Sequence, residues 1–195
     1  MRSVKNFIGD FDSSFLSCEK DTELIIRKLF TDSRPYSDEL KRLLLINTKD
    51  CLDDRTNQTY IDKINSTSIA DLMDQGYIRL KPKFEFGENQ EVMSYIVISY
   101  DHFITNGKNP HYRDCIVMID IFCNTDVWDL GNFRQRPLKI AGYIDGILND
   151  NKLTGIGLLE FIGCNENILN ENLAGYCLMY RAVHGEDDSI EPEDE

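Results

Sequence analysis

Apolar side chains in the first 75 residues recur at intervals of three or four, a spacing that predicts amphipathic helices. Three helices are expected, over about 21–30, 37–46 and 69–74, with Gly76 ending the last of them. The polar stretch 47–66 has few periodic apolar positions. It is predicted to be a long loop, and loops of that length are usually functional or bound to a partner.

Strand-like apolar runs dominate the second half of the chain. Residues 92–105 and 112–123 predict a β-hairpin with a five-residue turn, because Asn, Gly and Pro lie between the runs. The run Cys115–Cys123 is almost continuously apolar, which predicts a central strand buried on both faces. Two further strands are expected over 155–162 and 173–183, joined by a polar turn.

A helix is expected between the two strand pairs, because Pro137 suits the first position of a helix. Gly142 and Gly146 lie four residues apart and predict a close approach of this helix to the sheet. The expected fold class is α+β: an antiparallel sheet with a β-β-α-β-β core, covered by a helix, with the N-terminal helices alongside. The inward stripe of the covering helix is expected to consist of Leu138, Ala141, Ile144 and Leu148.

Composition divides the chain into three segments. Residues 1–90 hold an N-terminal arm, the helices and the polar loop, and residues 91–184 hold the α+β core. Residues 185–195 contain seven acidic side chains and no basic one, which predicts a disordered tail. The arm, residues 1–20, carries scattered apolar side chains among Gly, Ser and Asp, and is expected to pack on another surface without forming a regular element by itself.

The charge balance excludes some classes of partner. The 195 residues include 34 acidic and 21 basic side chains, for a net charge of −13. Non-specific nucleic-acid binding needs a basic surface, and an anionic membrane would repel this chain. The first 17 residues lack an uninterrupted apolar core, so no signal peptide is expected. The six cysteines form no CxxC pair and are expected to be reduced.

The sequence contains no recognisable catalytic or metal-binding constellation. The three histidines are far apart, and no zinc spacing is present. A Cys–His pair using Cys123 or Cys177 is disfavoured, because both cysteines lie inside predicted strands. Asp120 and Glu160 also lie inside apolar runs, where burial would require a partner such as Arg181. The favoured interpretation places both acids on the solvent side of the sheet. No metal, no cofactor and no enzymatic activity are expected.

The order of elements in residues 92–184 resembles the tail-terminator and tail-completion proteins of tailed bacteriophages. The resemblance is carried by the strand and Trp-containing loop of 112–128, the helix of 136–148, and the strands of 155–162 and 174–180. It rests on the order of elements, without a defining motif. It implies a helix-covered antiparallel sheet that assembles as a ring at the head–tail junction. The long N-terminal segment suits a particular neck, such as the stacked ring proteins of crAss-like phages.

The resemblance implies a structural virion protein that is assembled in the host cytoplasm and located in the virion. The expected partners are copies of the chain in a ring, adjacent neck, portal or tail proteins, and DNA that passes through the channel without specific binding. Two other functions stay open. An acidic binding protein or DNA mimic that inhibits a host enzyme would need its acids clustered on one face. A carboxylate-dependent hydrolase would need Asp120 and Glu160 in one pocket.

The loop 124–135 is the predicted subunit contact, because Trp and Arg are frequent in interface hot spots. An alternative for Trp128, slightly favoured, is that it closes the core of its own domain. Arg134 and Arg136 lie beside a helix start that is already positive, so an acidic partner on a neighbouring copy is expected. The predicted oligomer interface consists of Trp128, Leu130, Phe133, Arg134 and Arg136.

Overall fold

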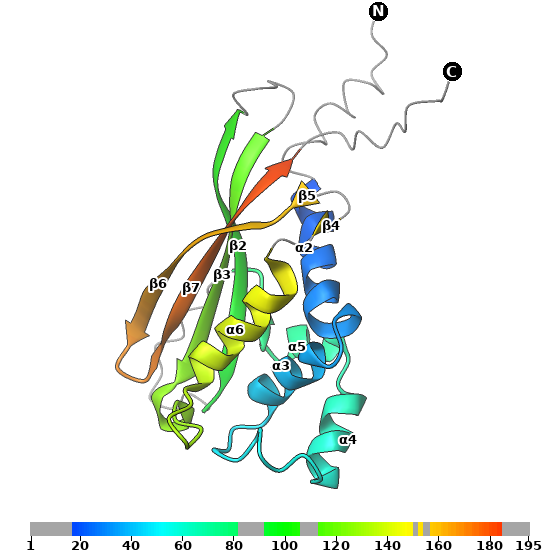
Figure 1. The fold of residues 1–195 in the computed structure, drawn as a ribbon, viewed down its shortest axis with the longest axis vertical. Helices are drawn as coiled ribbons and strands as arrows, with labels where there is room; N and C mark the ends of the chain where they lie inside the picture. The colour runs from blue at the N-terminus through cyan, green and yellow to red at the C-terminus, as the bar shows by residue number, and fades with distance from the viewer. Residues whose placement is uncertain (1–16, 82–91, 106–112, 150–151, 154–156, 185–195) are drawn as a thin grey trace, which may run out of the picture.

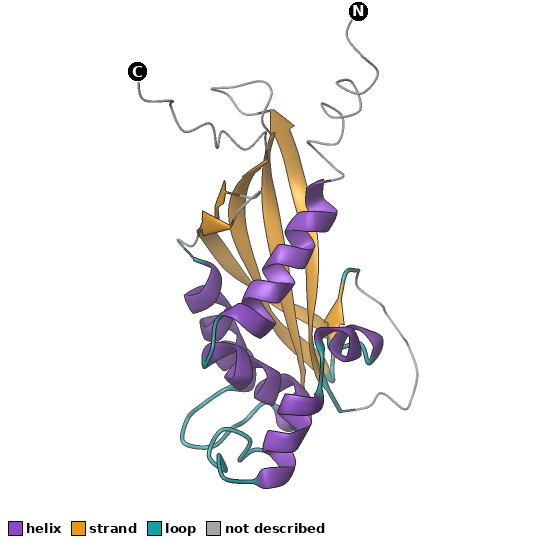
Figure 2. Cartoon of the chain, turned by 90° about the vertical axis from the view of Figure 1, so that its right-hand side faces the viewer, coloured by secondary structure: helices purple, strands orange, loops and turns teal. Residues whose placement is uncertain are grey.

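The computed structural model places helices on one side of a twisted five-stranded sheet (Figures 1 and 2). The expected α+β class, with N-terminal helices alongside an antiparallel sheet, is confirmed. The acidic tail, the hairpin turn 106–110 and most of the N-terminal arm lie outside the described residues. The structure describes residues 17–81, 92–105, 113–149, 152–153 and 157–184.

The strands are arranged in the order β1-β2-β3-β7-β6, with β3 in the centre. Strand β1 pairs parallel with β2, and the other neighbours pair antiparallel. A separate two-stranded pair consists of β4 (Lys152–Leu153) and β5 (Gly157–Leu158). The strands of the main sheet are β1 (Ile78–Arg79), β2 (Ser94–Thr105), β3 (Arg113–Asn124), β6 (Glu160–Asn170) and β7 (Leu173–His184).

The helices precede β1 or connect β3 to the later strands. Gly76, with φ +78°, follows α5, as predicted for the end of that helix. The helices are α2 (Ser17–Arg27), the π-helical turn η1 (Lys28–Asp32), α3 (Tyr36–Leu45), α4 (Gln58–Ser66), α5 (Ile69–Asp74), the 3₁₀ turn η2 (Thr125–Val127) and α6 (Arg136–Leu148).

The prediction of a loop over residues 47–66 is wrong for the second half of this range, where α4 forms. Asn57 caps this helix, because its side chain accepts hydrogen bonds from the backbone N–H groups of Thr59 and Tyr60, at 3.1 and 3.3 Å. Only Tyr60 and Ile64 contribute apolar contacts to the core. Two inward side chains give too short a stripe for periodicity to reveal a helix.

Strand β6 continues much further than the sequence predicts. The expected strand ends at Ile162, followed by a polar turn from Cys164 to Asn172, whereas β6 runs through this polar stretch to Asn170. Its residues pair through backbone hydrogen bonds with β7 and need no alternating apolar pattern, because β6 is the edge of the sheet and its side chains are mostly exposed.

The central strand β3 is fully buried on one face only. The side that faces the helices is at most 1% exposed, whereas Ile116, Met118 and Asp120 on the other side are half-buried. The expected burial on both faces is therefore wrong for the outer face, where a small separate apolar cluster covers one end. The helix-facing residues are Cys115, Val117, Ile119 and Ile121, and the outer cluster consists of Tyr95, Val97, Phe122 and Leu173.

Helix α6 packs on the sheet through a stripe that differs from the predicted one. Leu138 is 50% exposed, and a Cβ added at Gly142 or Gly146 would meet no atom within 4 Å, so these glycines permit no close approach. The close approach lies inside the sheet instead: a Cβ on Gly175 would sit 1.8 Å from the carbonyl oxygen of Ile121. The buried α6 side chains include Ile140, Ala141, Ile144, Ile147 and Leu148.

Candidate functional site

Asp120 and Glu160 do not share a site. The carboxylate of Asp120 accepts a hydrogen bond from Asn167 Nδ2 at 2.7 Å, and Glu160 forms an exposed ion pair with Arg181 at 3.6 Å. Asp120 lies opposite Cys177 on β7, whereas Glu160 lies opposite Arg181, four residues further along. Four residues separate the two acids by about 13 Å along the strand direction, and β7 lies between their two strands. The two acids therefore do not provide the pocket that the hydrolase hypothesis requires.

The cysteines are all free thiols, and the buried ones are poor nucleophiles. Burial raises the pKa of Cys123 to about 11. Burial and the neighbouring Asp120 raise the pKa of Cys177 to about 12, so both thiols stay protonated at neutral pH. Within the described ranges, no group of three or more potential metal ligands converges. No helix in those ranges has the length and apolarity needed to cross a membrane.

The predicted contact loop between β3 and α6 forms a short protrusion. It begins with η2, where the Asn124 side chain accepts a hydrogen bond from the N–H of Asp126 at 2.9 Å. Three consecutive residues at its tip, Gly131, Asn132 and Phe133, have φ values of 72°, 51° and 62°. Left-handed backbone is unfavourable for a residue with a large side chain. The tip therefore holds Phe133 in an unusual conformation, and its side chain is fully exposed.

The base of the loop belongs to the core of its own chain. Leu130 is 1% exposed and is part of the main hydrophobic core. Trp128 is half-buried and packs against the same core, and its indole N–H donates to Gln135 Oε1 at 3.4 Å. Trp128 therefore takes the place that the sequence favoured for it, between strand and helix.

Arg134 finds its acidic partner within the same chain. Its Nη1 and Nη2 donate to the two carboxylate oxygens of Asp53 at 2.9 and 2.6 Å. Hydrogen bonding and the charge of Arg134 hold the pKa of Asp53 below its usual range. The same guanidinium donates to the carbonyls of Gly131 and Leu130. Arg134 thus ties the protruding loop to the segment that follows α3.

Arg136 is completely buried, which corrects the expectation that it contacts a neighbouring subunit. Its guanidinium donates to the carbonyls of Val127 and Thr48 at 2.8 Å each, of Ile46 at 3.0 Å, and of Leu43. Leu43 and Ile46 lie at the C-terminal end of α3, where unpaired carbonyls and the helix dipole favour a positive charge. This end of α3, rather than an acid on another copy, compensates the positive charge at the start of α6.

The sheet leaves one long edge without a partner in the described part of the chain. Strand β6 has 11 residues, pairs only with β7, and lies beyond α6 at the margin of the molecule (Figure 1). Phe161, Ile162 and Ile168 on this strand are 39%, 40% and 67% exposed. Exposed edges of this kind are templates for pairing with another chain. Sequence reasoning missed this surface because it assigned most of the strand to a turn.

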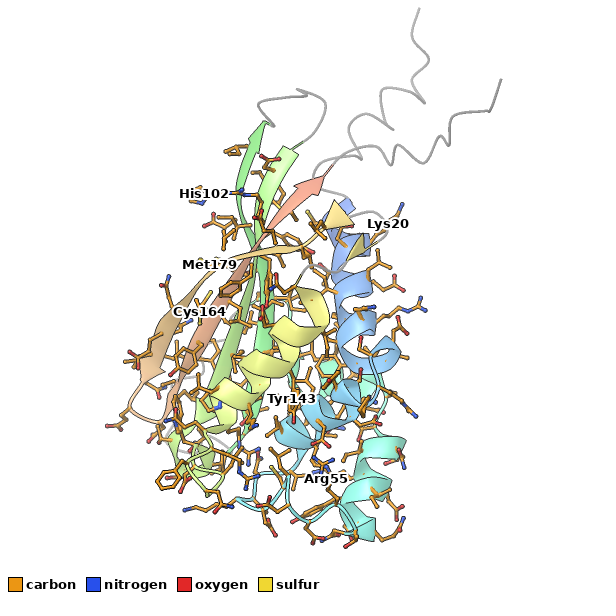
Figure 3. All side chains as sticks on the ribbon, viewed as in Figure 1. Lys20, Arg55, His102, Tyr143, Cys164 and Met179 are labelled. Carbon is orange, nitrogen blue, oxygen red and sulfur yellow. The ribbon has the colours of Figure 1, made fainter. Side chains whose placement is uncertain are left out.

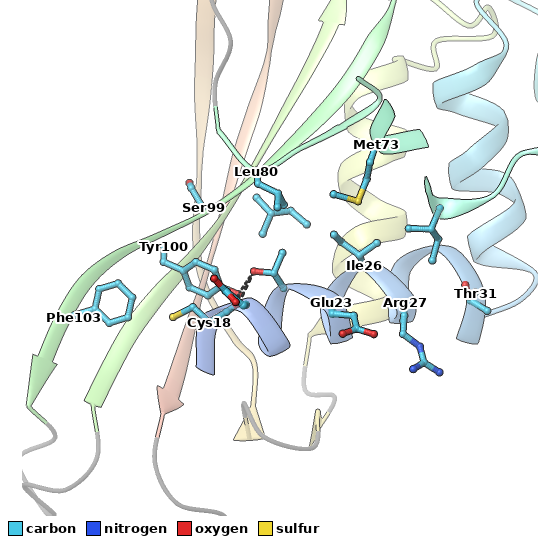
Figure 4. Close-up of a pocket in the computed structure, with 14 residues that line it drawn as sticks. Cys18, Glu23, Ile26, Arg27, Thr31, Met73, Leu80, Ser99, Tyr100 and Phe103 are labelled. Atoms are coloured by element: carbon cyan, nitrogen blue, oxygen red, sulfur yellow. Dashed lines mark hydrogen bonds between the residues drawn. The ribbon is translucent and has the colours of Figure 1, made fainter. Parts of the chain in front are cut away.

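An apolar groove of about 960 Å³ lies between α2, α5 and β2 (Figure 4). At one end, the hydroxyls of Thr22 and Tyr100 form a hydrogen bond of 2.9 Å. The groove was also missed by sequence reasoning, because its lining comes from segments that are far apart in the sequence. Its apolar lining includes Ile26, Ile69, Met73, Leu80, Ile98 and Phe103.

Comparison with known protein families identifies the family of the chain. The family model described as YomW matches residues 37–182, a range that covers nearly all of the chain from α3 to β7. No curated protein and no solved structure matches the chain.

Proposed function

The chain belongs to the YomW family, a phage-type family, and from this premise we propose that it is a structural virion protein of a tailed phage. In this proposal, copies of the chain assemble into a ring at the head–tail connection, in contact with adjacent neck, portal or tail proteins. DNA passes through the ring without specific binding, which suits a chain with a net charge of −13.

The observation that carries the proposal is the open edge β6. β6 is an 11-residue edge strand with three exposed apolar side chains, and a long exposed edge of this kind is a template for pairing with another chain. The opposite edge of the sheet is different, because β1 has only two residues and covers only part of β2. When two unlike patches meet on successive copies, the contact is head-to-tail and closes into a ring by rotation.

Phe133 at the tip of the loop between β3 and α6 is the proposed second contact. Its side chain is fully exposed, and its left-handed backbone is held by the hydrogen bonds of Arg134 around it. A large aromatic side chain presented on an exposed loop is a typical interface anchor. Within the predicted interface, Trp128, Leu130, Arg134 and Arg136 support the loop from inside, and Phe133 presents the contact surface.

Native mass spectrometry and negative-stain electron microscopy of the purified full chain test this proposal. The expected result is a closed ring with one fixed copy number. The variant Ile168→Lys is expected to weaken association by about tenfold or more, because it replaces the most exposed apolar side chain of β6 with a charge in the proposed contact. The monomer is expected to stay folded, since this side chain is 67% exposed.

Tyr36→Lys is the matched control, because Tyr36 is an exposed apolar residue (52%) on α3, away from β6. It is expected to leave the ring intact. A strictly monomeric wild type at all concentrations, alone and with candidate neck proteins, would contradict the proposed function. An unchanged ring in Ile168→Lys would exclude β6 as the contact.

A further inference from the structure

The apolar groove has oppositely charged ends. Glu19 and Glu23 lie along the first two turns of α2, and Arg27 is the last residue of that helix. All three are exposed and line the groove, and none forms an ion pair within the described part of the chain. The groove therefore has an apolar floor, with acidic side chains in the first two turns of α2 and a basic side chain at the end of that helix.

We infer that this groove binds the N-terminal segment, residues 1–16, of a second copy of the chain. The inference rests on the proposed function, because it supplies a contact between neighbouring copies of the ring. The segment immediately precedes α2 in the sequence, so each copy carries one segment and one groove. When the segment of each copy binds the groove of the next copy, all copies are linked head to tail, as a ring requires.

The apolar side chains of the segment match the floor of the groove. They occupy positions i, i+3, i+4, i+7 and i+11, so a helical segment would present them as a single stripe. A stripe of this kind fits a hydrophobic groove, which is a common mode of peptide recognition. The stripe consists of Val4, Phe7, Ile8, Phe11 and Phe15.

Charge decides the direction in which the segment lies. Lys5 and Asp12 are seven residues apart in the sequence, so a segment that became helical on binding would place both on the same side of the apolar stripe. Their separation along such a helix would be about 10 Å, close to the rise of about 12 Å along α2 between Glu19 and Arg27. A segment that runs parallel to α2 therefore places Lys5 beside Glu19 and Asp12 beside Arg27.

The same charges disfavour binding of the N-terminal segment in the groove of its own chain. Residue 16 is joined directly to Ser17 at the start of α2, so a segment that folds back into its own groove must run antiparallel to the helix. In that direction Asp12 meets Glu19 and Lys5 meets Arg27, and both pairs repel. A second copy can enter the groove in the parallel direction, in which both pairs attract.

Two charge swaps that preserve the net charge test the inference on the full chain. The segment swap is Lys5→Glu with Asp12→Lys, and the groove swap is Glu19→Lys with Arg27→Glu. Each swap alone is expected to weaken assembly by about tenfold, because two exposed attractive pairs become repulsive. The chain that carries both swaps is expected to assemble like the wild type. Assembly is measured by mass photometry as a function of concentration and salt.

An equimolar mixture of the two singly swapped chains separates exchange between copies from docking within one copy. In the mixture, each segment finds a matching groove on a chain of the other type, so rings are expected to form again. A segment that docks in its own chain would gain nothing from mixing. If ring assembly recovers in the doubly swapped chain but does not recover in the mixture, the segment docks within its own chain and the inference is wrong.

The matched control is the swap Lys20→Glu with Asp32→Lys. Both residues are exposed beside the groove without lining it, and Lys20 points away from the molecule (Figure 3). This control is expected to assemble normally. The inference fails if the wild type forms rings and the segment and groove swaps leave those rings unchanged. It also fails if neither the doubly swapped chain nor the mixture of singly swapped chains restores assembly. In both cases the proposed function stands. A wild type that never forms rings contradicts the proposed function itself.

Discussion

At the scale of single residues, Arg136 shows how a charged side chain is stabilised inside a protein by carbonyl groups. Four backbone carbonyls surround its guanidinium, and no ion pair with a carboxylate is found for it among the described residues. Three of these carbonyls belong to the end of α3 or to the residues just after it. The side chain therefore fastens the start of α6 to the end of α3.

Replacing Arg136 with methionine is expected to lower the free energy of unfolding by about 3–5 kcal/mol, because buried carbonyls lose a charged donor. Arg134→Met is the comparison, with a much smaller expected loss, since its partner Asp53 is half exposed and solvent screens the pair. Urea unfolding followed by circular dichroism measures both. Equal losses in the two variants would contradict the assigned roles.

At the scale of secondary-structure elements, glycines distinguish how α6 and β7 are packed. Gly142 on α6 has open space where a side chain would be, whereas a Cβ added at Gly175 on β7 would lie 1.8 Å from the carbonyl oxygen of Ile121. The sheet is therefore the tightly packed layer at this point, and the helix rests on it through branched side chains such as Ile140 and Ile144.

Gly142→Ala is expected to raise the free energy of unfolding by about 0.5–1 kcal/mol, because alanine favours the helix and meets no neighbouring atom. Gly175→Ala is expected to lower it by at least about 3 kcal/mol or to prevent folding, because the added Cβ would displace backbone. Thermal and urea unfolding compare the two variants. A destabilised Gly142→Ala would show that α6 lies closer to the sheet than described.

At the scale of the whole molecule, assembly and monomer stability make opposite demands on the tip of the β3–α6 loop. Phe133 adopts a left-handed backbone with φ 62°, and its side chain makes no contribution to the core. A glycine would suit this backbone better. The proposed role of Phe133 as an interface anchor explains why an aromatic residue occupies a position that favours glycine.

Phe133→Gly is expected to stabilise the isolated chain by about 1 kcal/mol, because the unfavourable backbone conformation is relieved. The same change is expected to weaken ring assembly, because the exposed aromatic side chain is lost. Asn132→Gly is the control: it relieves a similar backbone, with φ 51°, but keeps the aromatic side chain and normal assembly. Unfolding curves and mass photometry give the two readouts. Normal rings in Phe133→Gly would remove this residue from the proposed interface.

The sequence by itself determined the elements whose stability comes from local patterns. The stripe that includes Leu40, Leu43 and Leu44 predicted α3, and the Pro137 start predicted α6. The long apolar runs predicted β2, β3 and β7, and with them the β-β-α-β-β order of the core. These elements are recognisable because each buries an apolar face, and the helical or strand period of that face is visible in consecutive residues of the sequence.

Tertiary structure decided the elements and contacts whose partners are far apart in the sequence. Strand β6 is held by backbone pairing with β7, so its polar side chains carry no strand pattern. Arg136 reaches carbonyls about 90 residues away, as the separations of 88 to 93 to Thr48, Ile46 and Leu43 show. The apolar groove arises only where α2, α5 and β2 meet. Backbone pairing, buried donors and shared surfaces depend on the three-dimensional neighbours of a residue, and local periodicity does not encode those neighbours.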